Sequence, residues 1–326
     1  MKLILSFFCA FLIIFAASGQ NIAVDHQLKG LTIRSSVVDG DSGLLGTKGE
    51  KKGGGCVYGL NNKGKWTALN KGKALSPDVE DVQAVAIVTA DIYLAGTWKN
   101  GLFISENKGK SWEKLLAFPS QDIRSIQVSP HSQLIYAVTM DKGILKSFDN
   151  GYTWVTCTAD SIIKSTGAWS IEIDPENDSI VYAMSFSGAV LRSIDQGCSW
   201  QSVLTHDGIM FYDLAISSVN SAKIWAAGAN DSSGVFYFSY DRGEHWFITK
   251  NIPNITMNEV VVIEQLEYVI AGSWGQGCYL MRNDYNWTKI EGIAFDTTTD
   301  MWIQNDSILH VFTWGDGVYR IDLSEL

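Results

Sequence analysis

Acidic side chains recur along this chain where short apolar runs begin, and their type and spacing could support chemistry. Two carboxylates on either side of a glycosidic bond can hydrolyse it, one of them acting as a general acid. Tyr212 and Arg124 lie close to two of the acidic residues, and Tyr212 could act as a nucleophile. The acidic positions are Asp81, Asp122, Asp213, Glu259 and Asp300. The last four, together with Tyr212, are the catalytic candidates.

Three tryptophans lie in phrases of similar sequence and are candidates for ligand contact. Trp98 lies in GTWKNG, Trp274 in SWGQG and Trp314 in TWGDG. Aromatic faces beside carboxylates suit sugar rings or basic peptide side chains. A purely structural role is the alternative, because an Asp before a strand often caps a turn and a repeated Trp often packs between units.

A longer phrase recurs along the whole chain. It reads SFDNGYTW at 147–154, SIDQGCSW at 193–200 and SYDRGEHW at 239–246, with the looser copy SENKGKSW at 105–112. With two more degenerate copies, the closing tryptophans are spaced 46, 42, 46, 46 and 41 residues apart. A fixed period of this length indicates a repeat architecture.

Each conserved position of the phrase has a mechanical task. The third residue, Asp or Asn, can accept hydrogen bonds from backbone amides of the turn. The Gly at the fifth position supplies the positive φ that closes a hairpin. The Trp begins the next strand and offers a large apolar face for packing between repeats.

This S-x-D-x-G-x-T-W pattern resembles the Asp-box, or BNR, repeat of sialidases, sortilin-type receptors, xyloglucan-degrading hydrolases and photosystem assembly factors. The resemblance covers nearly all of the chain after its first 19 residues. It implies a β-propeller fold, whereas function differs among the families that share the repeat.

The chain reads as an all-β, seven-bladed β-propeller of four-stranded antiparallel blades. Apolar runs of four to six residues alternate with Gly, Asp, Asn and Pro, and no stretch has convincing helical periodicity. The innermost strands are expected to begin near residues 35, 82, 123, 169, 212, 259 and 300. The last blade lacks its outermost strand, which we expect residues 22–34 to supply, closing the ring. Residues 20–326 would form this one domain.

Residues 1–19 read as a secretory signal peptide, with Lys2, a short apolar run and a small-residue exit. The run is short for a membrane span, so we expect a secreted or periplasmic protein. Loss of Lys2 changes the formal net charge from −10 to −11, which argues against a nucleic-acid partner.

The cysteines that remain after cleavage are expected to be four free, mostly buried thiols. The repeat register separates them, and no metal-ligand spacing joins them to histidine. Neither a metal nor a Gly-rich phosphate loop is indicated, so we expect no cofactor. The four are Cys56, Cys157, Cys198 and Cys278.

In a four-stranded blade, the recurring phrases lie on one face, between the third and fourth strands. The opposite face gathers the loops after each second strand and those leading into each innermost strand, and loops on a rigid scaffold commonly carry function. We expect an acidic mouth there with an aromatic rim. The ligand-binding candidates on this face are Trp98, Arg124, Trp274 and Trp314.

These residues favour an exported, non-catalytic binding propeller that recognises a glycan or a protein segment. The alternative is a glycoside hydrolase, sialidase-like or xyloglucanase-like. Sialidases grip a carboxylate with three arginines, but Arg192, Arg282 and Arg320 fall on outer strands and leave Arg124 alone near the axis. The xyloglucan-degrading relatives use two propellers, and this chain has room for one. Photosystem assembly factors match in layout but favour a G-G-x-T-W phrase.

Overall fold

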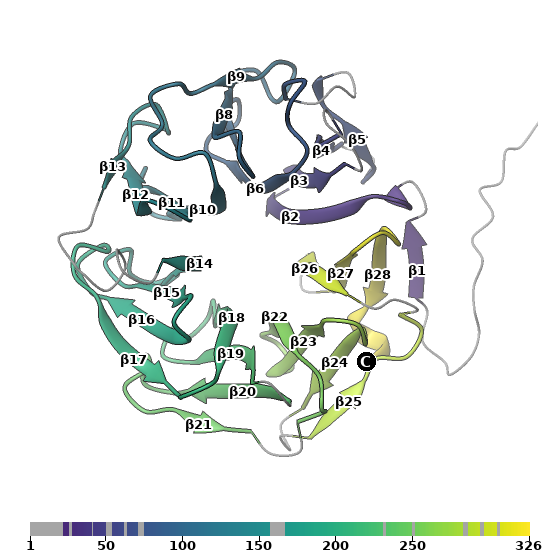
Figure 1. Cartoon of the computed structure of the whole chain (residues 1–326). Coiled ribbons are helices and arrows are strands. Elements are labelled where there is room, and N and C mark those ends of the chain that lie inside the picture. Colours follow the sequence, from purple (N-terminus) through teal and green to yellow (C-terminus); the bar gives the residue numbers. More distant parts are fainter. Residues whose placement is uncertain are drawn as a thin grey trace, which may run out of the picture.

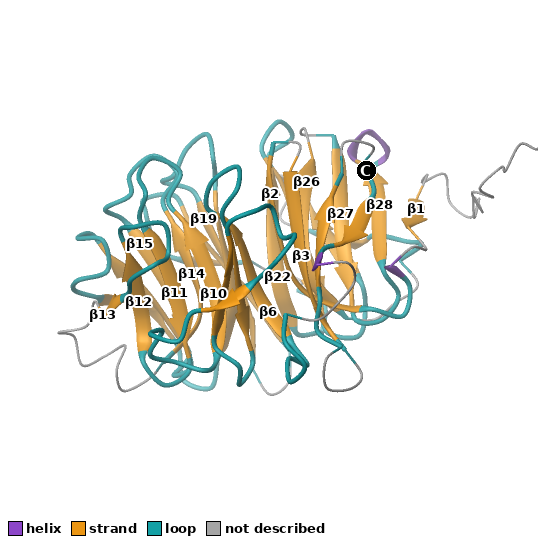
Figure 2. Ribbon diagram, turned by 90° about the horizontal axis from the view of Figure 1, so that it is seen from above, coloured by secondary structure: helices purple, strands orange, loops and turns teal. Residues whose placement is uncertain are grey.

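A computed structural model of the chain shows a seven-bladed β-propeller, as the sequence predicted (Figure 1). Viewed from the edge, the strands run between two faces covered by loops (Figure 2). The predicted signal peptide lies outside the described residues. The structure describes residues 22–25, 28–40, 42–49, 54–61, 64–70, 75–156, 167–230, 233–249, 252–282, 286–293, 297–304 and 307–326.

Each blade is an antiparallel sheet of four strands. The innermost strands begin within three residues of the predicted positions. From the axis outward, blade 1 contains β2 (Thr32–Asp39), β3 (Ser42–Lys48), β4 (Val57–Leu60) and β5 (Trp66–Ala68); blade 2 contains β6 (Val82–Ile87), β7 (Tyr93–Thr97), β8 (Leu102–Ser105) and β9 (Glu113–Lys114); blade 3 contains β10 (Ile123–Val128), β11 (Ile135–Thr139), β12 (Gly143–Ser147) and β13 (Val155–Thr156); blade 4 contains β14 (Ala168–Ile173), β15 (Val181–Ser185), β16 (Ala189–Ser193) and β17 (Gln201–Thr205).

The remaining blades follow the same order. Blade 5 contains β18 (Met210–Ile216), β19 (Ile224–Ala229), β20 (Gly234–Ser239) and β21 (Phe247–Ile248); blade 6 contains β22 (Met257–Ile263), β23 (Tyr268–Ser273), β24 (Cys278–Met281) and β25 (Trp287–Lys289); blade 7 contains β26 (Thr298–Gln304), β27 (Ile308–Thr313), β28 (Val318–Asp322) and β1 (Ile22–Asp25). A short 3-10 helix, η3 (Leu323–Glu325), follows β28.

The ring is closed by the amino-terminal strand, as predicted. β1 pairs antiparallel with β28, from Ile22 opposite Ile321 to Asp25 opposite Val318 (Figure 1). The closing strand is shorter than predicted, because residues from Thr32 onward belong to β2 of blade 1. One blade therefore joins strands from both ends of the chain, and the β28 edge is paired.

The recurring phrase forms the turn between the third and fourth strands. In blade 3, Ser147 Oγ accepts from the Gly151 amide at 2.9 Å and donates to Asp149 Oδ1 at 2.8 Å. Asp149 Oδ1 also accepts from the Thr153 amide at 2.8 Å, and Trp154 Nε1 donates to the Gly151 carbonyl at 2.8 Å. All these groups satisfy one another inside the turn, so the phrase is structural. The phrases at 193–200 and 239–246 repeat the four bonds.

The hydrophobic core lies between neighbouring blades. Between blades 3 and 4, for example, the fully buried Tyr136 and Val138 pack with Ile171 and Val181, and Trp200 of the recurring phrase joins them. Small residues on the second strands allow this close approach. At Gly96 a Cβ would lie 2.6 Å from Ile123 of the next blade, so nothing larger fits without movement. Rigid packing of this kind fixes the side chains at the axis.

Candidate functional site

Every innermost strand has a β-bulge at the same place, near its start. In β2 the cross-strand pairs pass from Ile33 to Ser35, so Arg34 is an extra residue outside the register. A bulge bends the strand and re-aims the side chain of the extra residue. Here the seven extra residues line cavities around the axis, and we call them the bulge ring. Its members are Arg34, Gln83, Arg124, Trp169, Tyr212, Asn258 and Thr299.

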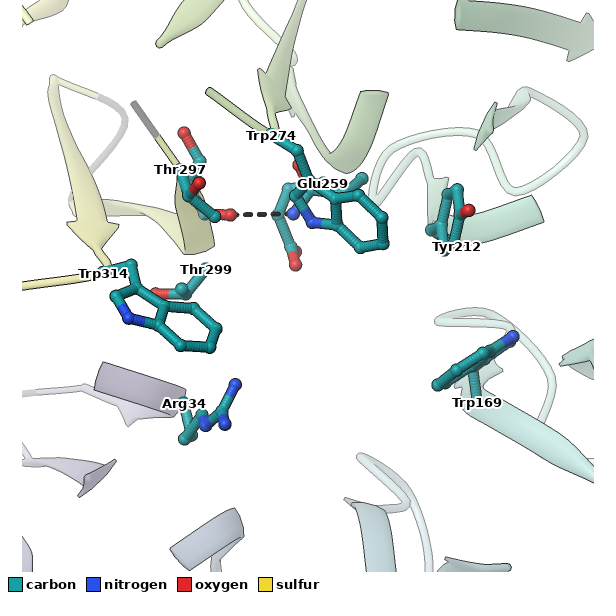
Figure 3. Close-up of a pocket in the computed structure, with 10 residues that line it drawn as sticks. Arg34, Trp169, Tyr212, Glu259, Trp274, Thr297, Thr299 and Trp314 are labelled. Carbon is teal, nitrogen blue, oxygen red and sulfur yellow. Dashed lines mark hydrogen bonds between the residues drawn. The ribbon is translucent and has the colours of Figure 1, made fainter. Parts of the chain in front are cut away.

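A cavity of about 640 Å³ opens at the bulge ring, on the face opposite the recurring phrases. Figure 3 shows the side chains that line it. We call it the main cavity. Five bulge residues line it, together with one tryptophan after the second strand of each of blades 6 and 7, and with residues at the start of β26 and in β22. The lining residues are Arg34, Trp169, Tyr212, Asn258, Glu259, Trp274, Thr297, Thr298, Thr299 and Trp314.

One side of the main cavity is aromatic. The Tyr212 ring lies 4.9 Å from the Trp274 ring and 6.5 Å from the Trp169 ring, measured between centroids. Phe186 packs edge-on against Trp169 at 4.2 Å and supports it from behind. Half of the Trp274 surface remains exposed, at 50%. These rings come from blades 4, 5 and 6 and present a continuous apolar wall.

The opposite side is formed by Arg34 and Trp314 (Figure 3). The Arg34 guanidinium binds the Asp81 carboxylate at 3.2 Å through Nε and at 3.1 Å through Nη2. Its central carbon lies 4.5 Å from the centre of the Trp314 ring, which is a cation–π contact. Asp81 is only 1% exposed. The charge of Arg34 is therefore matched, and its plane is fixed between a buried carboxylate and an indole.

Arg124, at the equivalent bulge position of blade 3, has its own acidic partner. Its Nε is 3.1 Å from Asp122 Oδ1. Removal from water raises the pKa of Asp122 above its usual value, although the Arg124 charge acts in the opposite direction. Arg124 lines a second cavity of about 270 Å³ below the main one. Asp122 thus serves as the counter-ion that positions Arg124.

Four carboxylates lie deeper, on the innermost strands of blades 4 to 7. Burial raises the pKa of Asp213 to about 7 and that of Asp300 to about 6. Burial, and then the neighbouring Asp213 charge, raise the pKa values of Glu172 and Glu259 well above their usual range. Like charges gathered in a confined space disfavour simultaneous ionisation. The group therefore holds protons at a pH where isolated carboxylates have none.

Three of these carboxylates accept hydrogen bonds from neighbouring blades. Asp213 Oδ2 accepts from the Val260 amide of the next blade at 2.8 Å. Asp300 accepts from the Ser36 amide of blade 1 and from Met301. Glu172 accepts from Gln127 Nε2 at 3.2 Å. In the described part of the chain, no donor is hydrogen-bonded to the carboxylate of the fourth, Glu259.

The structure brings four of the predicted site residues into the main cavity: Tyr212, Glu259, Trp274 and Trp314. Asp213, Asp300 and Arg124 line the second cavity instead. Trp98 and Asp122 line neither, and the Lys99 ammonium covers the Trp98 ring at 3.8 Å.

The predicted acidic mouth needs correction. Asp213, Glu259 and Asp300 do not end the loops that lead into the innermost strands; they lie within those strands, one residue after the bulge. They therefore project deeper along the axis. The mouth itself is formed by the bulge ring, which contains two arginines and no carboxylate.

Sequence reasoning missed Arg34 and Trp169. The sequence pattern puts Arg34 in the closing strand and leaves Arg124 as the only arginine expected near the axis; the structure places both on innermost strands. Trp169 is the second residue of β14, the position equivalent to Arg124 in β10. The bulge residue is the second residue in five innermost strands but the third in β2 and β18, so a fixed position in the strand does not find Arg34.

The cysteines only partly follow the expected burial. Cys278 is fully buried and its Sγ lies 3.4 Å from Thr298 Oγ1, whereas Cys198 is exposed in the turn phrase and Cys56 is half-buried. The expectation of mostly buried thiols is thus wrong for Cys198. No two of these three form a disulfide with each other, and Cys157 lies outside the described residues. Within the described ranges, no cluster of His, Cys, Asp or Glu is arranged to hold a metal ion.

Similar solved structures share this architecture at low sequence identity. A family-74 xyloglucanase from Xanthomonas campestris superimposes with a TM-score of 0.72 at 14% identity, over 91% of this chain and 53% of that one. A structure described as YCF48 bound to D1 peptide gives 0.70 at 11% identity, over 96% and 99% of the two chains. The extracellular domain of a putative one-component system from B. thetaiotaomicron gives 0.69 at 12%, over 95% and 39%.

No protein-family model matches the chain. No curated protein matches it in sequence. The chain spans about half the length of the family-74 enzymes it resembles. Among the described residues, no helix has the length and apolar character needed to cross a membrane. At these identities the likeness concerns the fold, and it places the chain in a broad group of seven-bladed β-propellers that contains both hydrolases and peptide-binding proteins.

Proposed function

We propose that this chain is an exported, non-catalytic binding propeller whose main cavity holds a glycan or a protein segment. The observation that carries the proposal is the exposed aromatic lining of that cavity: Trp169, Tyr212, Trp274 and Trp314 surround about 640 Å³ on the face opposite the structural turns. Trp274 and Trp314 are 50% and 48% exposed. Large rings left half-exposed around a cavity are typical of ligand contact rather than packing.

Binding is favoured over catalysis because two of the candidate carboxylates already have partners. Asp213 and Asp300 accept backbone hydrogen bonds from neighbouring blades. Glycoside hydrolysis requires two carboxylates that both reach the scissile bond. Of the four deep carboxylates, only Glu259 lines the main cavity.

A glycoside hydrolase remains the second candidate on one observation. Burial raises the pKa of Glu259 well above its usual range, and a carboxyl group that stays protonated near neutral pH can act as a general acid. Asp213, Asp300, Asp122 or Tyr212 would then have to supply the second group. If the protein hydrolyses a glycoside and a Glu259→Gln variant does so equally well, Glu259 is not the general acid.

The structural neighbours support a binding role for a single propeller. The match to the YCF48 structure spans 99% of that chain, and its description names a bound peptide. The match to the xyloglucanase spans 53% of that chain, so half of the enzyme has no counterpart here. We also propose that residues 1–19 are a secretory signal and that the recurring phrases are Asp boxes, which would make the protein secreted or periplasmic.

The test is a glycan array and a pull-down of extracytoplasmic proteins with residues 20–326. The Trp274→Ala/Trp314→Ala double variant is compared with a Phe148→Ala/Tyr240→Ala control, whose exposed aromatic residues lie on the recurring phrases of the opposite face. We expect the first variant to lose a ligand that the control retains. Equal binding by both variants would show that the main cavity is not the binding site.

A further inference from the structure

Of the four deep carboxylates, Glu259 faces the main cavity and has no hydrogen-bond donor among the described residues. It also lines the second cavity and a third one of about 460 Å³ that is bordered by Glu172, Asp213 and Asp300, so its side chain stands at the floor of the main cavity. Glu259 is half-buried, and its ionised form is costly because it stands among other acidic groups without a partner in the described residues. The arrangement becomes favourable when a ligand supplies the missing positive charge and donors.

Charged groups face Glu259 from several strands. Asp213 of β18, Asp300 of β26 and Glu172 of β14 all act on it as like charges. Arg34 of β2 and Arg124 of β10 share lining positions with it, but each already has its own carboxylate, Asp81 and Asp122 respectively. The floor of the cavity is therefore acidic and lacks a matching cation within the described residues.

The walls above Glu259 suit a cation as well. Trp274, Tyr212 and Trp169 lie on the side away from Arg34, with Glu259 below Trp274 (Figure 3). Aromatic faces attract ammonium and guanidinium groups, most strongly when the cation is desolvated. The structure already contains one such contact, between the Arg34 guanidinium and Trp314 at 4.5 Å.

The main cavity offers an anionic ligand fewer favourable contacts than a cation. Both carboxylate oxygens of Asp81 engage the Nε and Nη2 atoms of Arg34, and Gln83 Nε2 approaches the same carboxylate at 3.3 Å. A ligand carboxylate at Arg34 would compete with a buried partner and approach the acidic floor. The charges thus disfavour an anion in the main cavity.

We propose that the main cavity binds a protein segment by taking a lysine or arginine side chain between Trp169, Tyr212 and Trp274, with Glu259 as its counter-ion. The proposal rests on the binding function given above and selects a basic polypeptide rather than a glycan. Because a bound cation favours the ionised form of Glu259, affinity should rise as pH rises through the elevated pKa of the free protein. Burial also raises the pKa of Asp213 to about 7 and that of Asp300 to about 6, so their ionisation at higher pH would strengthen the trend.

The probes are n-butylammonium and n-butylguanidinium chloride, which carry only the proposed side-chain groups. Binding to residues 20–326 is followed at pH 8 through the indole N–H signals of Trp169 and Trp274, assigned with single Trp→Phe variants. The neutral and anionic comparisons are 1-butanol and sodium butyrate. We expect the cations to bind more tightly than both, and Glu259→Gln to weaken them about tenfold.

Two further variants guard against a folding artefact. Glu113→Gln, on the exposed outermost strand β9, removes a distant carboxylate and should bind like wild type. Glu259→Asp keeps the charge on a shorter arm and should retain more affinity than Glu259→Gln. Wild-type binding should weaken from pH 8 to pH 5, while Glu259→Gln should show a smaller change.

Equal binding of butanol and butylammonium, tighter binding of butyrate, or full affinity in Glu259→Gln would overturn the proposal. These results are separable from the binding function itself. If the Trp274→Ala/Trp314→Ala variant loses a natural ligand while cations show no preference, the function stands and the basic side chain is wrong. If that variant loses nothing, both fail.

Discussion

The Asp213 carboxylate accepts a hydrogen bond from the Val260 amide at 2.8 Å, and this bond joins the innermost strands of blades 5 and 6. Asp300 does the same between blade 7 and blade 1, through Ser36. Two of the catalytic candidates thus also form hydrogen bonds that hold neighbouring blades together. Their burial has a consequence for stability that is independent of any ligand.

Asp213→Asn should change how stability depends on pH. Burial raises the Asp213 pKa from its ordinary 3.8 to about 7, so between pH 4 and 7 the folded state holds a proton that the unfolded state has released. The free energy of unfolding must then fall as pH rises across this window. Asparagine keeps an oxygen acceptor for Val260 but never ionises. We expect the variant to match wild type at pH 4.5 and to be more stable at pH 8 by about 2 kcal/mol.

Urea unfolding followed by tryptophan fluorescence at the two pH values measures this difference. Asp39→Asn, on the exposed end of β2, provides the control and should leave the pH dependence unchanged. An Asp213→Asn variant that loses stability between pH 4.5 and 8 as steeply as wild type would show that this carboxyl is not the source of the effect.

Arg34→Gln should be strongly destabilising at pH 7, because it leaves the Asp81 carboxylate, 1% exposed, without its bidentate partner. Breaking a buried pair from one side costs about 3 kcal/mol, whereas neutralising both partners costs less. We therefore expect Arg34→Gln/Asp81→Asn to recover part of the loss in a double-mutant cycle. The exposed pair of Lys108 and Asp91 gives the comparison, with a cost below about 1 kcal/mol. Additive effects at Arg34 and Asp81 would contradict the prediction.

The buried serine of the recurring phrase should matter more than its exposed neighbour. Ser193 Oγ, in a residue 1% exposed, accepts from the Gly197 amide at 2.7 Å. Ser193→Ala leaves that amide without its acceptor, at a cost of about 1–2 kcal/mol. Ser199→Ala removes an exposed bond to Asp195 and should cost less than about 0.5 kcal/mol. Thermal unfolding of the two variants measures the order, and equal effects would mean that the turn tolerates an unsatisfied amide.

The fold could be predicted because the same sequence pattern recurs in several blades. The regular tryptophan spacing indicates the repeat, and the seven innermost apolar runs count the blades. The Ser-Asp-Gly-Trp turn chemistry fixes the register of the third and fourth strands in blades 3, 4 and 5. No copy of the phrase lies between the closing strand and β2, so the pattern does not indicate where one ends and the other begins. The sequence therefore predicts those parts of the fold that short-range hydrogen bonds within each turn determine.

The site was predictable only in part because bulges leave no clear sequence signal. One extra residue in a strand changes which side chains face the axis, and at what depth. Tyr212, at the bulge, therefore lines the mouth, while Asp213, the next residue, reaches the neighbouring blade. The hydrogen bonds that occupy Asp213 and Asp300 come from blades 6 and 1, far along the chain. Sequence could identify the carboxylates but not distinguish these two from Glu259.

Removal of the closing strand should expose the edge of β28. Four residue pairs join β1 to β28, and an unpaired strand edge destabilises a closed ring and invites association. We expect residues 27–326 to melt at least about 5 °C below residues 20–326 and to form oligomers at concentrations where the longer chain is monomeric. A chain of residues 22–326 keeps β1 and serves as the control. Calorimetry and light scattering test both effects, and a monomer with unchanged melting would show that blade 7 is stable with three strands.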